Sequence, residues 1–260
     1  MALWAWIAAG YGVFLMITAV CLSGIGRRPV VLVACGAYAL VALGAGTLDS
    51  FWIQLLVPAV LLLGGYWLSG LFFHAPQPWL EAWLFSTDRR VFDRLEVNRR
   101  LAAAPAMLLE ALEAAYTADY VVVGAGAIVA ATHGAHVVSG YWTIVLAAEL
   151  ACYAALPFLR SRPPRTLEPP GVIERRAPRL RRLNISILDR ASVQANTIPS
   201  GHVAGAVAAS LAIMSVSATA GWVLLGAAVA ITVSAVAGRY HYSADCVLGA
   251  VVAVVAALAL

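Results

Sequence analysis

The stretch Asn196-Thr-Ile-Pro-Ser-Gly-His-Val-Ala-Gly205 joins a polar loop to a long apolar run, and the rest of the chain is best understood from it. A second stretch, Gly238-Arg-Tyr-His-Tyr-Ser-Ala-Asp245, follows about 40 residues on and stands at the same kind of boundary. An apolar run of about 20 residues has the length that crosses the hydrocarbon core of a bilayer. Both stretches are therefore expected at the mouth of a membrane helix.

The composition places the whole chain in a membrane. Of its 260 residues, 62% are hydrophobic and only 12% are charged, which is more apolar side chain than a soluble fold can bury. The net charge of +4 comes from arginines in loops beside the apolar runs, so we expect no nucleic-acid partner. The four cysteines lie in apolar runs without paired spacing, which indicates small buried hydrophobes.

The predicted fold class is an all-α polytopic membrane protein with about eight transmembrane helices. The first 22 residues lack a basic n-region and a cleavage site and therefore form a retained span. The segment from His74 to Arg100 is too polar to span, and its mixed aromatics and charges predict one or two short interfacial helices, with a solvated loop as the alternative. The predicted spans are Ala2–Leu22, Val30–Leu48, Phe51–Phe73, one within Pro105–Thr132, Tyr141–Leu159, Ser200 to about Ala218, Trp222–Ala237 and Ser243–Leu260.

Span counting brings the polar stretches together. A short turn joins the sixth and seventh spans, so Pro199–His202 and Arg239–Asp245 emerge on the same side of the membrane. The polar stretch from Arg160 to Ile198, whose prolines preclude one long helix, emerges there too. With eight spans, every arginine falls on that side, and the positive-inside rule would make it cytoplasmic.

The motif Pro199-Ser-Gly-His202 has the features of an anion site. Proline suits the first turn of a helix, and Ser200 and Gly201 would then present free backbone N–H groups at the positive end of the helix dipole. His202 could donate a proton to a leaving oxygen. A helix start with an incidental histidine is the alternative, and the Gly201-x-x-x-Gly205 spacing predicts close helix packing.

The motif His241-Tyr-Ser-Ala-Asp245 places an imidazole and a carboxylate on one face of a helix start. The carboxylate could accept the imidazole N–H, which fixes the tautomer and makes the other ring nitrogen more nucleophilic. Arg239 supplies a cation for phosphate. A metal pair or a purely structural bond are the alternatives, although no further ligand stands nearby at useful spacing.

A third cluster, Arg160-Ser-Arg-Pro-Pro-Arg165, follows the fifth span. The guanidinium groups of Arg162 and Arg165 could clamp phosphate oxygens, because their fork geometry matches those oxygens. Arginines after a span are more often topological signals, so the cluster gains weight only from its convergence with the two histidine motifs.

Together the three stretches resemble the type 2 phosphatidic-acid phosphatase superfamily, which also includes vanadium haloperoxidases. They are most similar to its inositol-phosphorylceramide-synthase-like branch, which shows Pro-Pro-Arg, Pro-Ser-x-His and Arg-Tyr-His-Tyr-x-x-Asp in this order. The resemblance covers roughly residues 51–260. It implies a six-helix lipid phosphatase core over these residues, with interfacial helices at 74–100, a polar active-site loop at 160–198, and two accessory helices in residues 1–50.

Carried over residue by residue, the resemblance implies that His241 is the nucleophile that forms a phosphohistidine. Asp245 would orient it, and His202 would be the general acid for the leaving alcohol. It implies no metal and no other cofactor. The phosphate would be bound by Arg162, Arg165, Arg239, Ser200 and Gly201.

The predicted function is hydrolysis of a lipid phosphomonoester or diphosphate, of the polyprenyl or phosphatidic acid type, by a multi-pass protein of a bacterial cell membrane. A phosphotransferase that uses an alcohol acceptor is the alternative on the same site, and a non-catalytic phosphate-lipid transporter or binding protein is the alternative of another class. The active site of this superfamily usually lies outside the cytoplasm, whereas the arginine count favours the cytoplasmic side. We therefore predict neither the side of the membrane that the active site faces nor the oligomeric state. Four acidic residues lie in predicted spans, where they are expected either to line the path of the substrate or to be structural. They are Glu110, Glu113, Asp119 and Glu149.

Overall fold

The computed structural model describes residues 1–169, 171–176 and 179–260. Within these ranges the chain is all-helical, and no strand is formed. Two apolar helices, α10 (Gly201–Met214) and α12 (Ser243–Ala259), are shorter than the usual length of a membrane span. The predicted all-α polytopic fold is confirmed. Six helices are long and apolar enough to cross a membrane, namely α1 (Leu3–Cys21), α2 (Arg28–Gly46), α3 (Phe51–Gly70), α6 (Ala106–Thr132), α7 (Ala135–Ala155) and α11 (Ala218–Ala237).

Several predicted spans begin or end at other residues in the structure, and α7 and α10 are two examples. Helix α7 begins at Ala135, earlier than the predicted Tyr141, directly after the positive-φ residue Gly134 that closes the preceding turn. Helix α10 ends at Met214 and does not reach Ala218. The reason is local, because the hydroxyl of Ser217 caps the next helix by accepting the N–H of Ala220 at 3.4 Å.

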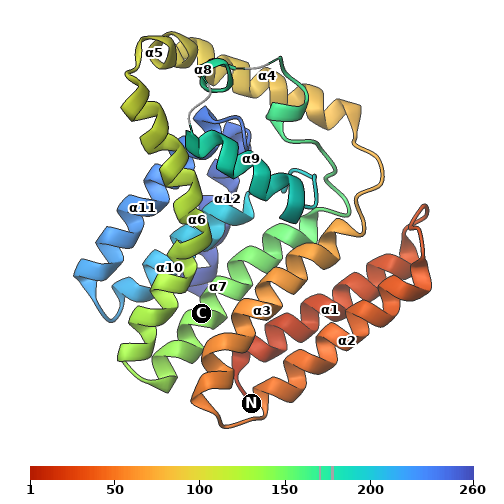
Figure 1. Cartoon of the computed structure of the whole chain (residues 1–260). Coiled ribbons are helices and arrows are strands. Elements are labelled where there is room, and N and C mark those ends of the chain that lie inside the picture. Colours follow the sequence, from red (N-terminus) through yellow and green to blue (C-terminus); the bar gives the residue numbers. More distant parts are fainter. Residues whose placement is uncertain (170, 177–178) are drawn as a thin grey trace.

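The short helix α10 lies at the centre of the bundle, where it packs against α6, α7, α11 and α12 (Figure 1). Its 14 residues span about 21 Å at 1.5 Å per residue, against about 30 Å for a hydrocarbon core. The helix is therefore shorter than that core, and other helices surround it. A Cβ atom added at Gly201 or Gly205 would collide with Tyr153 or Glu149 of α7, so the predicted close packing is confirmed.

The N-terminal helices α1 and α2 form a hairpin beside α3 and α7 (Figure 1). Buried tyrosines fasten this hairpin to α3, because the Tyr11 hydroxyl donates to the carbonyl of Gly65 at 2.9 Å and the Tyr38 hydroxyl donates to Leu61 at 3.0 Å. The turn between α1 and α2 comes back to the polar end of α3, where Gly24 lies against His74. The arginines of that turn thus lie toward the end that carries the other arginines.

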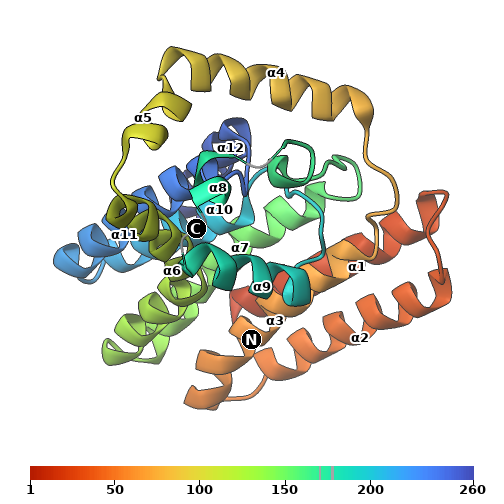
Figure 2. The same ribbon diagram turned by 45° about the horizontal axis from the view of Figure 1, so that its top comes forward.

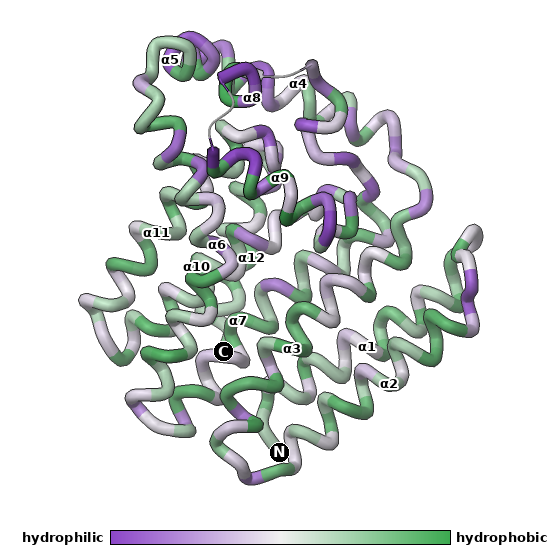
Figure 3. Tube along the Cα trace, viewed as in Figure 1, coloured by the Kyte–Doolittle hydropathy of each residue, from purple (hydrophilic) through white to green (hydrophobic). Residues whose placement is uncertain are grey.

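Short polar helices cover one end of the bundle. Helices α4 (Pro78–Arg94) and α5 (Val97–Ala103) lie across it, and Figure 2 shows α4 above the ends of the long helices. Figure 3 shows the hydrophilic residues gathered in the same region. The structure thus forms two short helices in and just beyond the predicted segment 74–100, while their place in the membrane interface stays a prediction. Helix α4 exposes Trp79 and Trp83 and buries Leu80 and Leu84. The loop 160–198 contains η1 (Pro164–Thr166), α8 (Val172–Arg176) and α9 (Arg179–Ala191).

Candidate active site

The two histidines of the sequence motifs face each other at this polar end. His202 lies in the first turn of α10, and His241 lies in the loop between α11 and α12. Their ring centroids are 5.6 Å apart and the ring planes are nearly perpendicular, at 76°. They are 39 positions apart in the sequence, yet the bundle brings both to the lining of one small space.

His202 is paired with a carboxylate of α6. Its Nδ1 atom lies 2.5 Å from Oδ2 of Asp119, a short charge-assisted contact, and the Asp119 side chain is only 8% exposed. Because the carboxylate accepts the proton on Nδ1, the other ring nitrogen, Nε2, is the one that can exchange a proton with a ligand. This pairing is the arrangement that a general acid requires.

His241 faces Asp245, but at a longer distance. Its Nδ1 atom lies 3.5 Å from Oδ2 of Asp245, which is beyond an ordinary N–H···O hydrogen bond. Helix α12 begins at Ser243, so His241 lies just before the helix and Asp245 lies in its first turn. Burial lowers the pKa of His241 well below its usual range, and the charges of His202 and Arg165 lower it further. A neutral imidazole is the nucleophilic form.

Arg165 is the arginine that lies beside the histidines. It is partly buried and lines the same space as His202 and His241. Its backbone N–H donates to the carbonyl of Arg239 at 3.0 Å, and its guanidinium lies 5.8 Å from the centre of the Tyr240 ring. Burial lowers the pKa of Arg165, and among the described residues no carboxylate forms an ion pair with it. An unpaired cation beside two histidines is suited to an anionic ligand.

The space among these side chains is small, about 20 Å³, which is the size of one water molecule. It shares Tyr66, Leu188, Ser192 and His202 with a larger groove of about 270 Å³. The groove is mainly apolar and lies between α3, α6, α7 and α9, and the carboxyl groups of Asp119 and Glu149 are part of its lining. A phosphoryl group would have to displace side chains of the small space, while an apolar chain could extend along the groove.

A polar network supports the loop that carries His241. The ring of Tyr240 stacks on Tyr116 of α6, with centroids 3.6 Å apart and an interplanar angle of 7°. The Tyr240 hydroxyl donates to Glu113 at 2.5 Å, and the fully buried Glu113 also accepts from Asn184 of α9 at 2.8 Å. Arg181 of α9 donates to the carbonyl of Gly238 at 2.6 Å. Helices α6 and α9 therefore hold the loop that carries His241 from one side.

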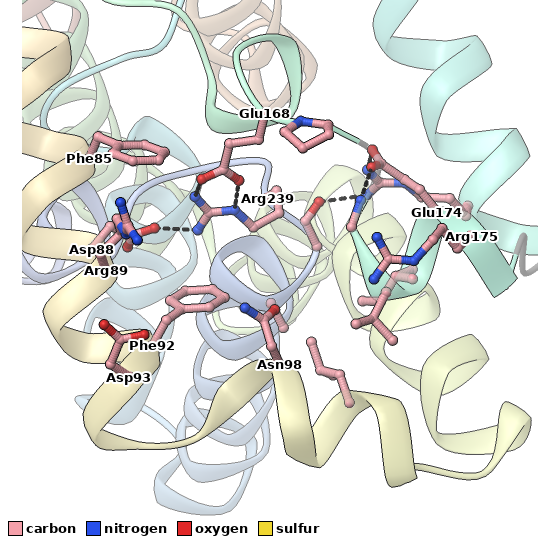
Figure 4. A pocket seen from close by; sticks show the side chains of 18 residues that line it. Phe85, Asp88, Arg89, Phe92, Asp93, Asn98, Glu168, Glu174, Arg175 and Arg239 are labelled. Atoms are coloured by element: carbon pink, nitrogen blue, oxygen red, sulfur yellow. Dashed lines mark hydrogen bonds and ion pairs between the residues drawn. The ribbon is translucent and has the colours of Figure 1, made fainter.

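The structure does not bring Arg162 and Arg239 to the histidines. Arg162 is exposed and pairs with Glu81 of α4, with its Nη2 atom 2.9 Å from the carboxylate. Arg239 is held by Asp88 and makes two 2.7 Å bonds to Glu168, as Figure 4 shows. It lines a separate cavity of about 420 Å³ on the other face of its loop. The phosphate role of both arginines stays a prediction, and it would require these ion pairs to open.

The start of α10 differs from its prediction, because the helix begins at Gly201 and Pro199 lies outside its first turn. Ser200 is the N-cap and accepts the N–H of Val203 at 3.4 Å, but its own backbone N–H donates to the carbonyl of Asp245 at 2.9 Å. The expectation that this N–H is free is therefore wrong, because α12 begins against α10 at this point. The N–H of Gly201 lies 3.4 Å from the hydroxyl of Thr197, a long contact that a better acceptor could replace.

Sequence reasoning gave no definite role to Asp119 and Glu149, which the structure places beside the site. Both are buried carboxylates of long apolar helices, and that signal by itself marks a functional candidate. Glu149 accepts the Tyr153 hydroxyl at 2.7 Å and lines the groove. Only the packing of α6 and α7 against α10 distinguishes them from Glu110, whose carboxylate accepts the backbone N–H groups of Arg179 and Leu180 at the surface. Among the described residues, no three His, Cys, Asp or Glu side chains lie close enough to hold a metal ion.

An all-helical membrane bundle with two facing histidines, each beside a carboxylate, defines a class of protein suited to phosphoryl chemistry at a bilayer. Comparison with family models matches residues 82–259 to the PAP2 superfamily. This match covers most of the chain, so the chain belongs to the PAP2 superfamily, and membership supports an activity of the phosphatase or phosphotransferase type. Comparison with curated proteins gave no match, and comparison with solved structures gave none either. Helices α1, α2 and α3 lie outside the matched residues.

Proposed function

We propose that this chain is a membrane phosphatase that removes a phosphate or diphosphate from a lipid through a phosphohistidine on His241. The observation that carries the proposal is that His202 and His241 line one space with ring centroids 5.6 Å apart, with the unpaired guanidinium of Arg165 beside them. A nucleophile, a proton donor and a fixed cation are the three groups that phosphoryl transfer to a side chain requires.

The proposed reaction has two steps. In the first, Nε2 of His241 attacks phosphorus, the ester P–O bond breaks, and Nε2 of His202 gives its proton to the leaving oxygen. In the second, His202 takes a proton from a water molecule that attacks phosphorus, the P–N bond breaks, and phosphate leaves with His241 neutral again. Asp119 would stabilise the charged His202, and Arg165 would offset the negative charge on the phosphoryl oxygens.

The groove supports a lipid as the substrate. It leads to His202 between α3, α6 and α9, and the groove is lined mostly by apolar and aromatic side chains. Its volume, about 270 Å³, is close to the lower end of ligand pockets, which suits the first part of one apolar chain. A polyprenyl phosphate, a polyprenyl diphosphate and phosphatidic acid are the proposed substrates. We also propose that the chain belongs to the inositol-phosphorylceramide-synthase-like branch and that it lies in a bacterial cell membrane.

The test is phosphate release by purified protein in detergent, across a panel of lipid phosphates, with EDTA present. We expect release that continues in EDTA, because the histidines and Arg165 would supply the proton transfers and the positive charge. His241→Ala removes the nucleophile, and Tyr242→Phe is a matched control that changes the next side chain but not the chemistry. Equal release by wild-type protein and His241→Ala would refute the phosphohistidine.

The same assay decides between hydrolysis and transfer. If no lipid releases phosphate in water but an added alcohol restores turnover, the protein is a phosphotransferase on the same site. A protein that binds these lipids and turns over none of them with any acceptor would be a binding protein or transporter.

A further inference from the structure

Asn196 is the side chain at which the three polar stretches meet. It is 1% exposed, and it belongs to the loop that precedes α10. Its Nδ2 atom donates to Oδ2 of Asp245 at 2.8 Å and to the hydroxyl of Ser161 at 3.1 Å. Its backbone N–H donates to the carbonyl of Ser161 at 2.8 Å. The loop after α7, the start of α10 and the start of α12 are therefore joined through one residue.

The chemistry of the pair fixes the orientation of the Asn196 amide. The NH₂ group of Asn196, and not its carbonyl oxygen, faces Asp245, where a carboxyl oxygen can accept its N–H. Oδ2 of Asp245 accepts a second bond from the backbone N–H of Tyr242 at 3.0 Å. The same oxygen lies 3.5 Å from Nδ1 of His241. Two donors thus hold the one carboxylate oxygen that faces the imidazole.

We propose that Asn196 is a positioning residue for the nucleophile, which acts by holding the carboxylate of Asp245 against His241. This inference rests on the proposed function, because it assigns a role in forming the phosphohistidine. With the donor in place, Asp245 directs the proton of His241 to Nδ1 and leaves the lone pair on Nε2 for attack. Without it, only the Tyr242 N–H remains to fix the carboxylate, which is then free to turn away.

The structure supplies a matched control for this role. The amide of Asn196 binds two side chains, so Ser161→Ala removes one bond of the amide and leaves the bond to Asp245. Asn196→Ala removes both bonds. Asn196→Leu keeps about the size of the side chain, but it has no donor for Asp245. The isosteric variant thus tests the donor even if the alanine variant folds poorly.

The experiment measures kcat, KM and the single-turnover rate of phosphohistidine formation on a lipid phosphate, with wild-type protein and these three variants. We expect both Asn196 variants to lose about 10- to 100-fold in kcat, the usual effect of a partner that orients a reacting group. KM should stay near the wild-type value, because no contact with the lipid is removed, and phosphohistidine formation should slow to the same degree. Ser161→Ala should retain the wild-type rate.

Three results would overturn the inference. Wild-type kinetics in Asn196→Leu would show that the donor is not needed. Equal losses in Ser161→Ala and Asn196→Ala would assign the effect to the loop and not to Asp245. In both cases phosphate release by wild-type protein would leave the proposed function intact. If wild-type protein turns over no lipid phosphate with water or an alcohol, the proposed function fails and this inference fails with it.

Discussion

Replacing Asp119 by asparagine tests the role of His202 most directly. The substitution keeps the shape of the side chain but removes the charge that lies 2.5 Å from Nδ1 of His202. The contact is largely buried, since the two side chains are 27% and 8% exposed. If the charge serves to hold His202 as a proton donor, its loss should lower kcat and leave lipid binding nearly unchanged.

The size of the effect follows from the geometry of this contact. A hydrogen bond to a charged group contributes about 1.5–3 kcal/mol, and about 1.4 kcal/mol corresponds to a tenfold change in rate. We therefore expect kcat to fall about 10- to 150-fold on an alkyl phosphate. General acid catalysis as a whole contributes about 100- to 10,000-fold, so the predicted loss lies within that limit.

The assay compares two leaving groups. An alkyl oxygen needs a proton as it departs, whereas a nitrophenolate does not. In single turnovers, Asp119→Asn should therefore form the phosphohistidine much more slowly from the lipid phosphate and at a nearly normal rate from a nitrophenyl phosphate ester. Glu110→Gln is the matched control, because it removes a carboxylate of the same helix that accepts backbone N–H groups away from the histidines. Equal losses on both substrates would refute a role for Asp119 in leaving-group protonation.

The remaining predictions concern the cations, the nucleophile and the helix packing. Arg165→Gln should reduce kcat/KM about 100-fold and weaken inhibition by vanadate, because it removes the cation of the site. Arg162→Gln should change either quantity less than threefold, roughly the effect of losing an exposed ion pair. A larger loss in Arg162→Gln than in Arg165→Gln would contradict the assignment. The pKa of His241 in the folded protein lies below its ordinary value of 6.5. At a pH between the folded and the unfolded pKa, the unfolded state binds more protons than the folded state, so the free energy of unfolding decreases as the pH falls below about 6.5. The Tm of His241→Gln should therefore decrease less between about pH 7 and pH 5 than the Tm of wild-type protein, and parallel curves would contradict this. Gly205→Ala should lower the Tm, because the added Cβ would collide with Glu149. Glu149→Ala in the same chain should recover part of this loss. Additive losses of Tm in the double variant would show that the two residues do not share this contact.

Much of the fold could be predicted from the sequence, because hydrocarbon imposes a simple rule. A chain segment that crosses it must be a helix and must be apolar for about 20 residues, so composition and length reveal the spans without any knowledge of packing. The boundaries were less accurate. Helix α10 is shorter than its apolar run, because Ser217 begins the next helix inside that run. Apolar composition does not reveal where one helix ends and the next begins.

Within the candidate site, sequence order alone indicated that His202 and His241 lie at one end of the bundle. Short turns and span counting determine which loops share a side of the membrane, and those are local properties of the chain. Which arginine lies beside the histidines is not a local property of the chain. Arg162, Arg165 and Arg239 were all predicted to bind phosphate, and only packing shows that Arg162 and Arg239 have carboxylate partners while Arg165 lies beside the histidines.

The partners of the histidines were decided by the tertiary structure as well. Asp119 is 83 positions before His202, and Asn196 is 49 positions before Asp245, so no spacing rule links them. The sequence determines which side chains are chemically able to form a charge pair or a hydrogen bond. Which of them do so depends on distances of about 3 Å, and these are set only when α6, α7, α10 and α12 pack together.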